Sequence, residues 1–132
     1  MYHTIVFVGN LGRDPEMRYT PSGKAVTSFS VAVSDGFGDR KKTIWFRVSA
    51  WEKQAESCNN YLQKGSKVLV EGRLQSSDSG NPRIWTRQDG TPGASYEITA
   101  SIVRFLSAKG EVEANVENAP ASNDMNDEEI PF

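Results

Sequence analysis

The stretch that decides the fold runs from Thr43 to Ser76 and reads TIWFRVSAWEKQAESCNNYLQKGSKVLVEGRLQS. Residues Thr43 to Trp51 alternate between apolar and polar side chains, with the period of two that is typical of a half-buried β-strand. Residues Glu52 to Lys64 contain no β-branched side chain and place their apolar residues at helical spacing. Residues Ser66 to Ser76 alternate again. The stretch therefore predicts a strand, one helix and a second strand in this order.

The apolar positions of this helix and second strand indicate which faces are buried. The apolar residues at helical spacing are Ala55, Cys58 and Leu62. Gly65 follows them, and glycine is a common helix terminator. The alternating apolar residues of the second strand are Val68, Val70 and Leu74. Each element therefore presents one apolar face to a shared core.

Three further main strands are expected on either side of this stretch. Their ranges are His3 to Leu11, Ala25 to Ser34 and Tyr96 to Leu106, with a short continuation at Glu16 to Tyr19 after a bend at Gly12 to Pro15. Within them, one face holds Phe29, Val31 and Val33, and another holds Ile98, Ala100 and Ile102. Five main strands with one helix between the third and the fourth are the order expected of an OB-fold, an all-β, five-stranded Greek-key barrel.

Two of the predicted connections stand out. Residues Asp35 to Lys42 form a charged hairpin tip, and residues Ser77 to Ala94 are rich in Gly, Pro, Ser and Asp. The second connection is too long for a tight hairpin, so we expect a functional loop. The segment Gly9-Asn10-Leu11-Gly12 resembles a phosphate-binding GxxG motif. Because no predicted helix adjoins it, we interpret it as a bend.

Charge divides the chain into a body and a tail. Residues 1–107 contain 14 basic and 10 acidic residues, for a net charge of +4, whereas residues 108–132 contain one basic and seven acidic residues, for −6. The tail also lacks a periodic apolar face, so we expect it to be disordered. The predicted organisation is one barrel domain at 1–107 and an acidic tail at 108–132. The overall charge of −2 therefore does not exclude a polyanionic partner.

The cysteine content and the hydropathy indicate an intracellular protein. Cys58 is the only cysteine, so it cannot form an internal disulfide, and a reducing compartment fits best. The longest early apolar run, Ile5 to Val8, has no basic region before it and is far shorter than the roughly 20 residues of a membrane span. We therefore expect a soluble protein with no membrane contact.

The strand at Thr43 to Trp51 carries the most informative surface. If Ile44, Phe46, Val48 and Ala50 point into the barrel, the opposite face holds Trp45, Arg47, Ser49 and Trp51. Two exposed indoles beside a guanidinium suit unpaired bases that stack on the rings, with phosphates next to them. The alternative is that one or both rings pack on a neighbouring loop or subunit.

Both long connections repeat this combination of rings and cations. The first contains Phe37 with Arg40, Lys41 and Lys42, and the second contains Arg83, Trp85 and Arg87. A basic loop is often only solvated. Three places with interleaved aromatic and basic residues instead predict a groove, because OB-folds hold single strands on their sheet face and loops.

Signals for catalysis are poor. His3 is the only histidine and Cys58 the only cysteine, so a zinc site built on several such residues is excluded. Cys58 falls on the inner face of the predicted helix, which favours a core position over a nucleophile. The acidic residues of the body are scattered. We therefore expect no catalytic residue and no metal site.

Dispersed motifs of the chain closely resemble the bacterial single-stranded DNA-binding protein family. They match the family in order and spacing and are Val8-Gly9-Asn10-Leu11-Gly12-Arg13-Asp14-Pro15-Glu16 with Arg18-Tyr19, Trp45-Phe46-Arg47-Val48, Tyr61-Leu62-Gln63-Lys64-Gly65-Ser66, Glu71-Gly72-Arg73-Leu74 and Glu129-Ile130-Pro131-Phe132. The resemblance implies that the base-stacking rings are Phe37, Trp45, Trp51 and Trp85. It also implies a homotetramer of OB-folds without catalysis or cofactor, located in the bacterial cytoplasm at the nucleoid or encoded by a phage.

The end of the chain suggests a separate role. Acidic residues precede an apolar tip, in the order Asp124, Asp127, Glu128, Glu129, Ile130, Pro131 and Phe132. A solvating tail explains the charges but not the tip, which suits a basic pocket that takes a phenylalanine ring and a free carboxylate. The resemblance likewise implies that replication, recombination and repair proteins dock here.

Three functions remain open from the sequence. The first is sequence-independent binding of single-stranded DNA. The second is an OB-fold protein that binds RNA or assembles a primosome, because stacking and phosphate contacts suit either polymer. The third is an adaptor whose exposed rings bind protein.

Overall fold

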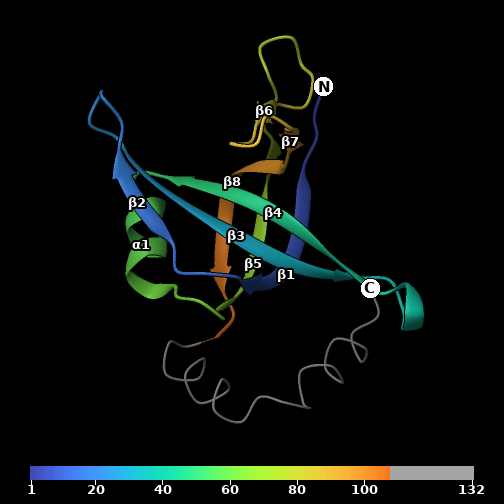
Figure 1. Ribbon diagram of the computed structural model, residues 1–132. Helices are drawn as coiled ribbons and strands as arrows, with labels where there is room; N and C mark the ends of the chain where they lie inside the picture. The colour runs from blue at the N-terminus through green and yellow to red at the C-terminus, as the bar shows by residue number, and fades with distance from the viewer. Residues whose placement is uncertain (108–132) are drawn as a thin grey trace.

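Most of the strands form one sheet, shown in the computed structural model of Figure 1, which describes residues 1–107. The strands of this sheet lie in the order β1-β5-β8-β4-β3-β2. Their bounds are β1 (Ile5–Leu11), β5 (Lys67–Leu74), β8 (Tyr96–Phe105), β4 (Lys42–Trp51), β3 (Ala25–Asp35) and β2 (Glu16–Tyr19). The remaining elements are α1 (Lys53–Tyr61), the 3-10 turn η1 (Gly38–Arg40), β6 (Ile84–Thr86) and β7 (Pro92–Ala94).

Strand β1 closes this sheet into a barrel. It pairs with β5 along most of its length and then with β3, through Asn10 opposite Ala32 and Leu11 opposite Val31. Gly9 permits this change of partner, because a Cβ atom at Gly9 would lie 2.2 Å from the Ala32 carbonyl oxygen. The segment that resembled a GxxG motif is therefore mostly strand. The predicted five-stranded barrel with one helix between its third and fourth strands is confirmed.

The barrel core consists of the apolar faces that strand alternation predicted for β3 and β4. Phe29, Val31, Phe46 and Val48 are buried, together with Val68, Val70 and Ile98 from β5 and β8. Phe7 of β1 stacks on Phe46, with ring centroids 4.1 Å apart and an interplanar angle of 11°. Opposite walls of the barrel therefore meet in its centre.

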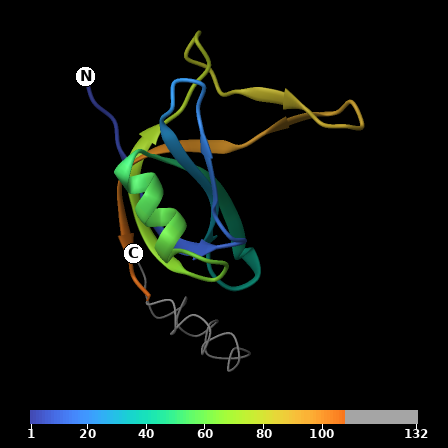
Figure 2. The same ribbon diagram turned by 90° about the vertical axis from the view of Figure 1, so that its left-hand side faces the viewer.

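Helix α1 lies against one end of the barrel (Figure 2). Its predicted apolar face is confirmed, since Ala55, Cys58 and Leu62 are buried. The buried hydroxyl of Thr27 on β3 donates a hydrogen bond of 2.6 Å to the Ala55 carbonyl and ties the sheet to the helix. The helix ends at Tyr61 rather than at Lys64, because Leu62 adopts an extended backbone.

Cys58 lies on the buried face of this helix, and burial raises the pKa of its thiol to about 12. We expect iodoacetamide to leave the folded protein unlabelled at pH 8 over the time that completes labelling of the urea-unfolded chain. The folded state also holds the thiol proton more tightly than the unfolded chain, so the free energy of unfolding should fall as pH rises from 9.0 toward about 12. Rapid labelling under native conditions would show that Cys58 is accessible.

Two apolar residues predicted to face the core are exposed instead. In β8, Glu71 pairs with Ile102 and Gly72 pairs with Ala100, so Ser101 is an extra residue that forms a bulge. The bulge reverses the alternation, so that Val103 packs on the core and Ile102 is exposed. Leu74 is exposed because pairing of β1 with β5 stops at Gly72, two residues before it.

The segment Ser77 to Ala94, predicted as an irregular loop, contains a small hairpin. Strands β6 and β7 pair antiparallel and form a separate two-stranded sheet that projects from the barrel (Figure 2). At its turn, the backbone N–H and the hydroxyl of Thr91 donate hydrogen bonds to Asp89, which lower the pKa of that carboxyl. Glycine and proline concealed these two three-residue strands in the sequence.

The predictions about the acidic tail fall on residues 108–132, outside the described residues. Within residues 1–107, no helix is long and apolar enough to cross a membrane.

Candidate nucleic-acid interface

The outer face of β4 carries a row of polar and aromatic side chains. Trp45 is 51% exposed and Trp51 is 40% exposed, while Phe46, Val48 and Ala50 between them are buried. The alternation predicted for this strand is therefore confirmed. Two adjoining hollows run along this face and share the lining residues Ser28, Arg47, Leu74, Gln75, Ser76 and Glu97. Together they form one open surface, which we call the β4 groove.

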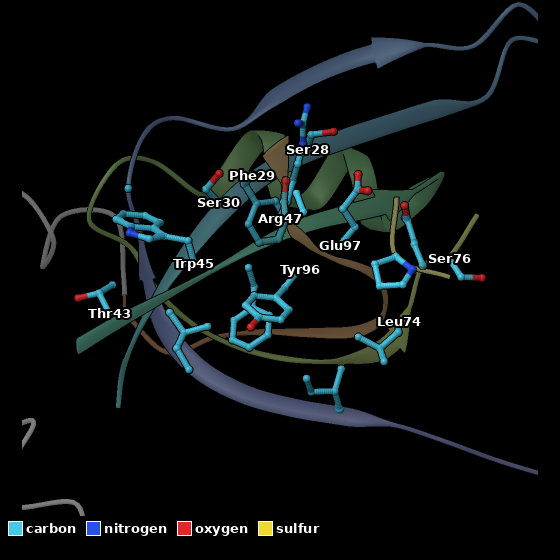
Figure 3. A pocket seen from close by; sticks show the side chains of 18 of the residues that line it. Ser28, Phe29, Ser30, Thr43, Trp45, Arg47, Leu74, Ser76, Tyr96 and Glu97 are labelled. Atoms are coloured by element: carbon cyan, nitrogen blue, oxygen red, sulfur yellow. The ribbon is translucent and has the colours of Figure 1, made fainter. Parts of the chain in front are cut away.

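The first section of the β4 groove lies around Trp45. Its wall includes Phe46 and Tyr96, whose ring centroids are 5.8 Å apart. The charged residues of this section are balanced, with Arg13, Lys42 and Arg47 against Asp14, Glu16 and Glu97. Figure 3 shows the Trp45 ring at one side of the groove and Ser76 at the other, with Arg47 and Glu97 between them. This section therefore combines aromatic rings with charged side chains that balance one another.

Gly12 holds the Trp45 ring in place. The indole lies against the backbone of the bend after β1, and a Cβ atom at Gly12 would lie 2.5 Å and 2.7 Å from two atoms of the ring. The sequence left open that a neighbouring loop covers one of the two indoles. This alternative is correct for the part of the Trp45 ring that lies against Gly12. The remaining exposed surface stays open to the groove.

Replacing Gly12 with alanine should displace the Trp45 ring. We expect a shift in tryptophan emission and a loss of about 1 kcal/mol in affinity for oligo(dT), the lower end of the range for one stacked base. The matched control is the same substitution in a Trp45→Ala background, where no ring remains to be moved. An equal loss of affinity in both backgrounds would contradict this role of Gly12.

The second section of the β4 groove is strongly basic. Trp51 lies here with four arginines that come from different parts of the chain, namely Arg18, Arg47, Arg73 and Arg83. Arg83 is positioned by a hydrogen bond of 3.2 Å from its Nε to the Ser76 carbonyl. Among residues 1–107, Glu97 is the only acidic residue that lines this section. Four guanidinium groups around one indole make a site for a polyanion that also offers a flat ring.

Several residues of the groove were not singled out from the sequence, among them two arginines and a tyrosine. Arg18 lies on β2, Arg73 on β5 and Tyr96 on β8, and each looks like an ordinary surface residue of its own strand. Only the pairing of β2 with β3, and of β8 with both β4 and β5, brings them beside Arg47. Two of them lie in motifs that resemble the family, Arg18 in Arg18-Tyr19 and Arg73 in Glu71-Gly72-Arg73-Leu74. These motifs were the signal that the sequence offered for the two arginines.

The hairpin tip between β3 and β4 lies at one end of the barrel, away from the β6–β7 hairpin (Figures 1 and 2). Phe37 is exposed just before η1, and Arg40 ends that turn. Lys42 lines the groove and forms an ion pair with Asp35 at 3.9 Å. Phe37, Arg40 and Lys41 do not line the groove.

Trp85 and Arg87 contact each other within the β6–β7 hairpin. The Arg87 guanidinium lies 5.1 Å from the Trp85 ring centroid and donates hydrogen bonds to the Thr91 hydroxyl and the Pro92 carbonyl. The Trp85 ring also lies against Gly93, where a Cβ atom would lie 2.5 Å from it, and its indole N–H donates a hydrogen bond of 3.3 Å to the Ser95 hydroxyl. Among the predicted binding residues, the structure thus brings Lys42, Trp45, Arg47, Trp51 and Arg83 into one groove. Trp85 and Arg87 remain on the projecting hairpin.

A closed barrel with this strand order and an open groove along its third main strand defines an OB-fold protein. Residues 2–106 match the model of the single-strand binding protein family, and the chain belongs to this family.

Two relatives show how far the similarity extends. A single-stranded DNA-binding protein of Neisseria meningitidis serogroup A is 38% identical over 112 residues, which cover 81% of this chain and 61% of the relative. The single-stranded DNA-binding protein 1 of Chlorobaculum tepidum is 39% identical over 111 residues, which cover 80% of this chain and 65% of the relative. The chain therefore spans less than two thirds of the length of these relatives.

Proposed function

We propose that the protein binds single-stranded DNA without sequence specificity in the β4 groove, and that it acts by binding rather than by catalysis. The observation that carries this proposal is the placement of Trp45, Trp51 and four arginines on one open surface. Unpaired bases stack on the indoles, and the guanidinium groups of the Trp51 section neutralise the phosphates. Both relatives are named single-stranded DNA-binding proteins, and this supports single-stranded DNA as the ligand.

The geometry favours a single strand over a duplex. Stacking on Trp45 and Trp51 requires bases whose faces are free, whereas a duplex buries both faces of each internal base. Among residues 1–107, no helix lines the groove that could enter a major groove. The duplex therefore retains only the phosphate contacts.

Titration with poly(dT), poly(U) and duplex DNA under identical salt conditions tests the proposal. We expect poly(dT) to quench the intrinsic fluorescence at the lowest concentration and duplex DNA at the highest. Tighter binding of poly(U) would favour the RNA-binding alternative. Absence of binding to all three would favour a protein adaptor.

The remaining parts of the proposal concern assembly and cellular role. We propose that residues 1–107 bind DNA, that the chain forms a homotetramer, and that it protects single-stranded DNA in replication, recombination and repair. Support comes from the resemblance of the motifs to the family. The expected location is the bacterial cytoplasm, at the nucleoid or during phage infection.

The tail at 108–132 has a separate role in this proposal, namely the recruitment of replication and repair proteins. Deleting residues 124–132 should leave DNA affinity equal or slightly higher at low salt, because the deletion removes negative charge that competes with DNA. It should also abolish pull-down of partner enzymes, and Phe132→Ala alone should reproduce most of that loss. A truncated protein that loses DNA binding but keeps its partners would contradict this division.

A further inference from the structure

The β4 groove extends from the outer face of β4 onto one end of the barrel. Here it is lined by apolar and aromatic residues of three neighbouring strands, namely Ile44 and Phe46 on β4, Leu74 on β5 and Tyr96 on β8. Tyr96 stands in register with the buried Phe46, and it shares the inward face of β8 with the buried Ile98. The Tyr96 side chain therefore lies where the end of the barrel opens into the groove.

Tyr96 presents an exposed ring that rests on the barrel core. The residue is 62% exposed although it belongs to the inward face of its strand. Its ring centroid lies 5.8 Å from that of Phe46, which in turn stacks on Phe7. Figure 3 draws the Tyr96 ring between Trp45 and Leu74. A tyrosine side chain has only two torsions, so a base that packs on this ring immobilises little additional freedom.

The charges around Tyr96 favour contacts with bases over contacts with phosphates. Three basic and three acidic residues line this section of the groove, so it offers a polyanion little net attraction. A strand that continues here from the arginines around Trp51 must therefore be held mainly by its bases. Among residues 1–107, Trp45 and Tyr96 are the exposed rings that line this section.

We propose that Tyr96 is a third base-stacking residue of the protein, in addition to Trp45 and Trp51. It takes a base at the open end of the barrel, where the bound strand leaves the outer face of β4. This inference rests on the proposed function of the β4 groove and adds one stacking position to it. Every base has a flat face, so a third ring keeps the binding independent of sequence.

Titration with oligo(dT) compares the wild-type protein with Tyr96→Ala, Tyr96→Leu and Tyr96→Phe. Alanine and leucine both remove the flat ring, whereas leucine still covers Phe46. We expect each of these two variants to raise the dissociation constant by about fivefold or more, as for the loss of one stacked base. Tyr96→Phe keeps the ring and should bind like the wild-type protein. The dependence of affinity on salt should be the same in all variants, because stacking on an uncharged ring replaces no counterion.

Tyr19→Ala is the matched control, because Tyr19 is 63% exposed on β2 and does not line the groove. It should bind oligo(dT) like the wild-type protein, and thermal melts should show that all variants are folded at the temperature of the titration.

Three outcomes would overturn one of the proposals. If Tyr96→Leu binds as tightly as the wild-type protein, no base stacks on Tyr96. If Tyr96→Ala lowers the mass measured by light scattering and leaves the affinity unchanged, the ring belongs to a contact between copies of the chain. If the wild-type protein itself fails to bind oligo(dT), the proposed function of the β4 groove is wrong.

Discussion

Replacing Trp45 or Trp51 with alanine is expected to weaken binding of oligo(dT) by about 1 to 3 kcal/mol each, which is roughly a fivefold to 150-fold loss. Each substitution removes a flat apolar surface on which one base stacks. Both indoles are substantially exposed on the outer face of β4, opposite the buried Phe46 and Val48. The barrel core therefore remains intact in both variants.

Isothermal titration and fluorescence quenching measure these losses. Tyr61→Ala is the control for removal of an exposed ring, because Tyr61 lies on α1 and does not line the groove. It should bind oligo(dT) like the wild-type protein. Thermal melts of all variants separate lost binding from lost folding. Unchanged affinity in both tryptophan variants would rule out stacking on the face of β4.

Removing the four arginines around Trp51 is expected to have the second large effect, on the salt dependence of binding. For single strands, the logarithm of the affinity falls with the logarithm of salt concentration with a slope of about −0.7 per phosphate contact. Alanine substitution of Arg18, Arg47, Arg73 and Arg83 should therefore make the slope less steep by about 3. Stacking on the indoles should leave some affinity at high salt.

A variant with four other basic residues removed controls for the change in overall charge. Suitable positions outside the groove are Lys24, Lys53, Lys64 and Arg104. This variant should weaken binding at low salt by long-range attraction alone, with a smaller change of slope. Equal changes of slope in the two variants would show that the arginines of the groove make no direct phosphate contacts.

The alternating pattern of β4 was predictable because it depends only on the strand period. Where a strand has no bulge, a residue two positions from Val48 shares its face. The same logic failed in β8 beyond Ala100. There the bulge at Ser101 depends on how β8 pairs with β5, and a single sequence carries no signal for that pairing.

The basic part of the groove was harder to predict because its residues come from separate strands. Arg18 and Arg73 are 55 positions apart in the chain, and sheet pairing alone places both beside Trp51. The contacts of Trp85 were equally hidden, since the packing of its ring on Gly93 depends on a hairpin of two short strands. The types of residue in the groove were therefore easier to predict than which of these residues lie together.

The most direct test of the central claim is photochemical cross-linking to an oligonucleotide that carries iododeoxyuridine, followed by identification of the cross-linked residues by mass spectrometry. This base forms cross-links efficiently with an aromatic ring on which it stacks. Stacking of bases in the β4 groove predicts cross-links at Trp45 and Trp51 on the outer face of β4. Cross-links confined to Tyr61, the aromatic residue of α1, would contradict it.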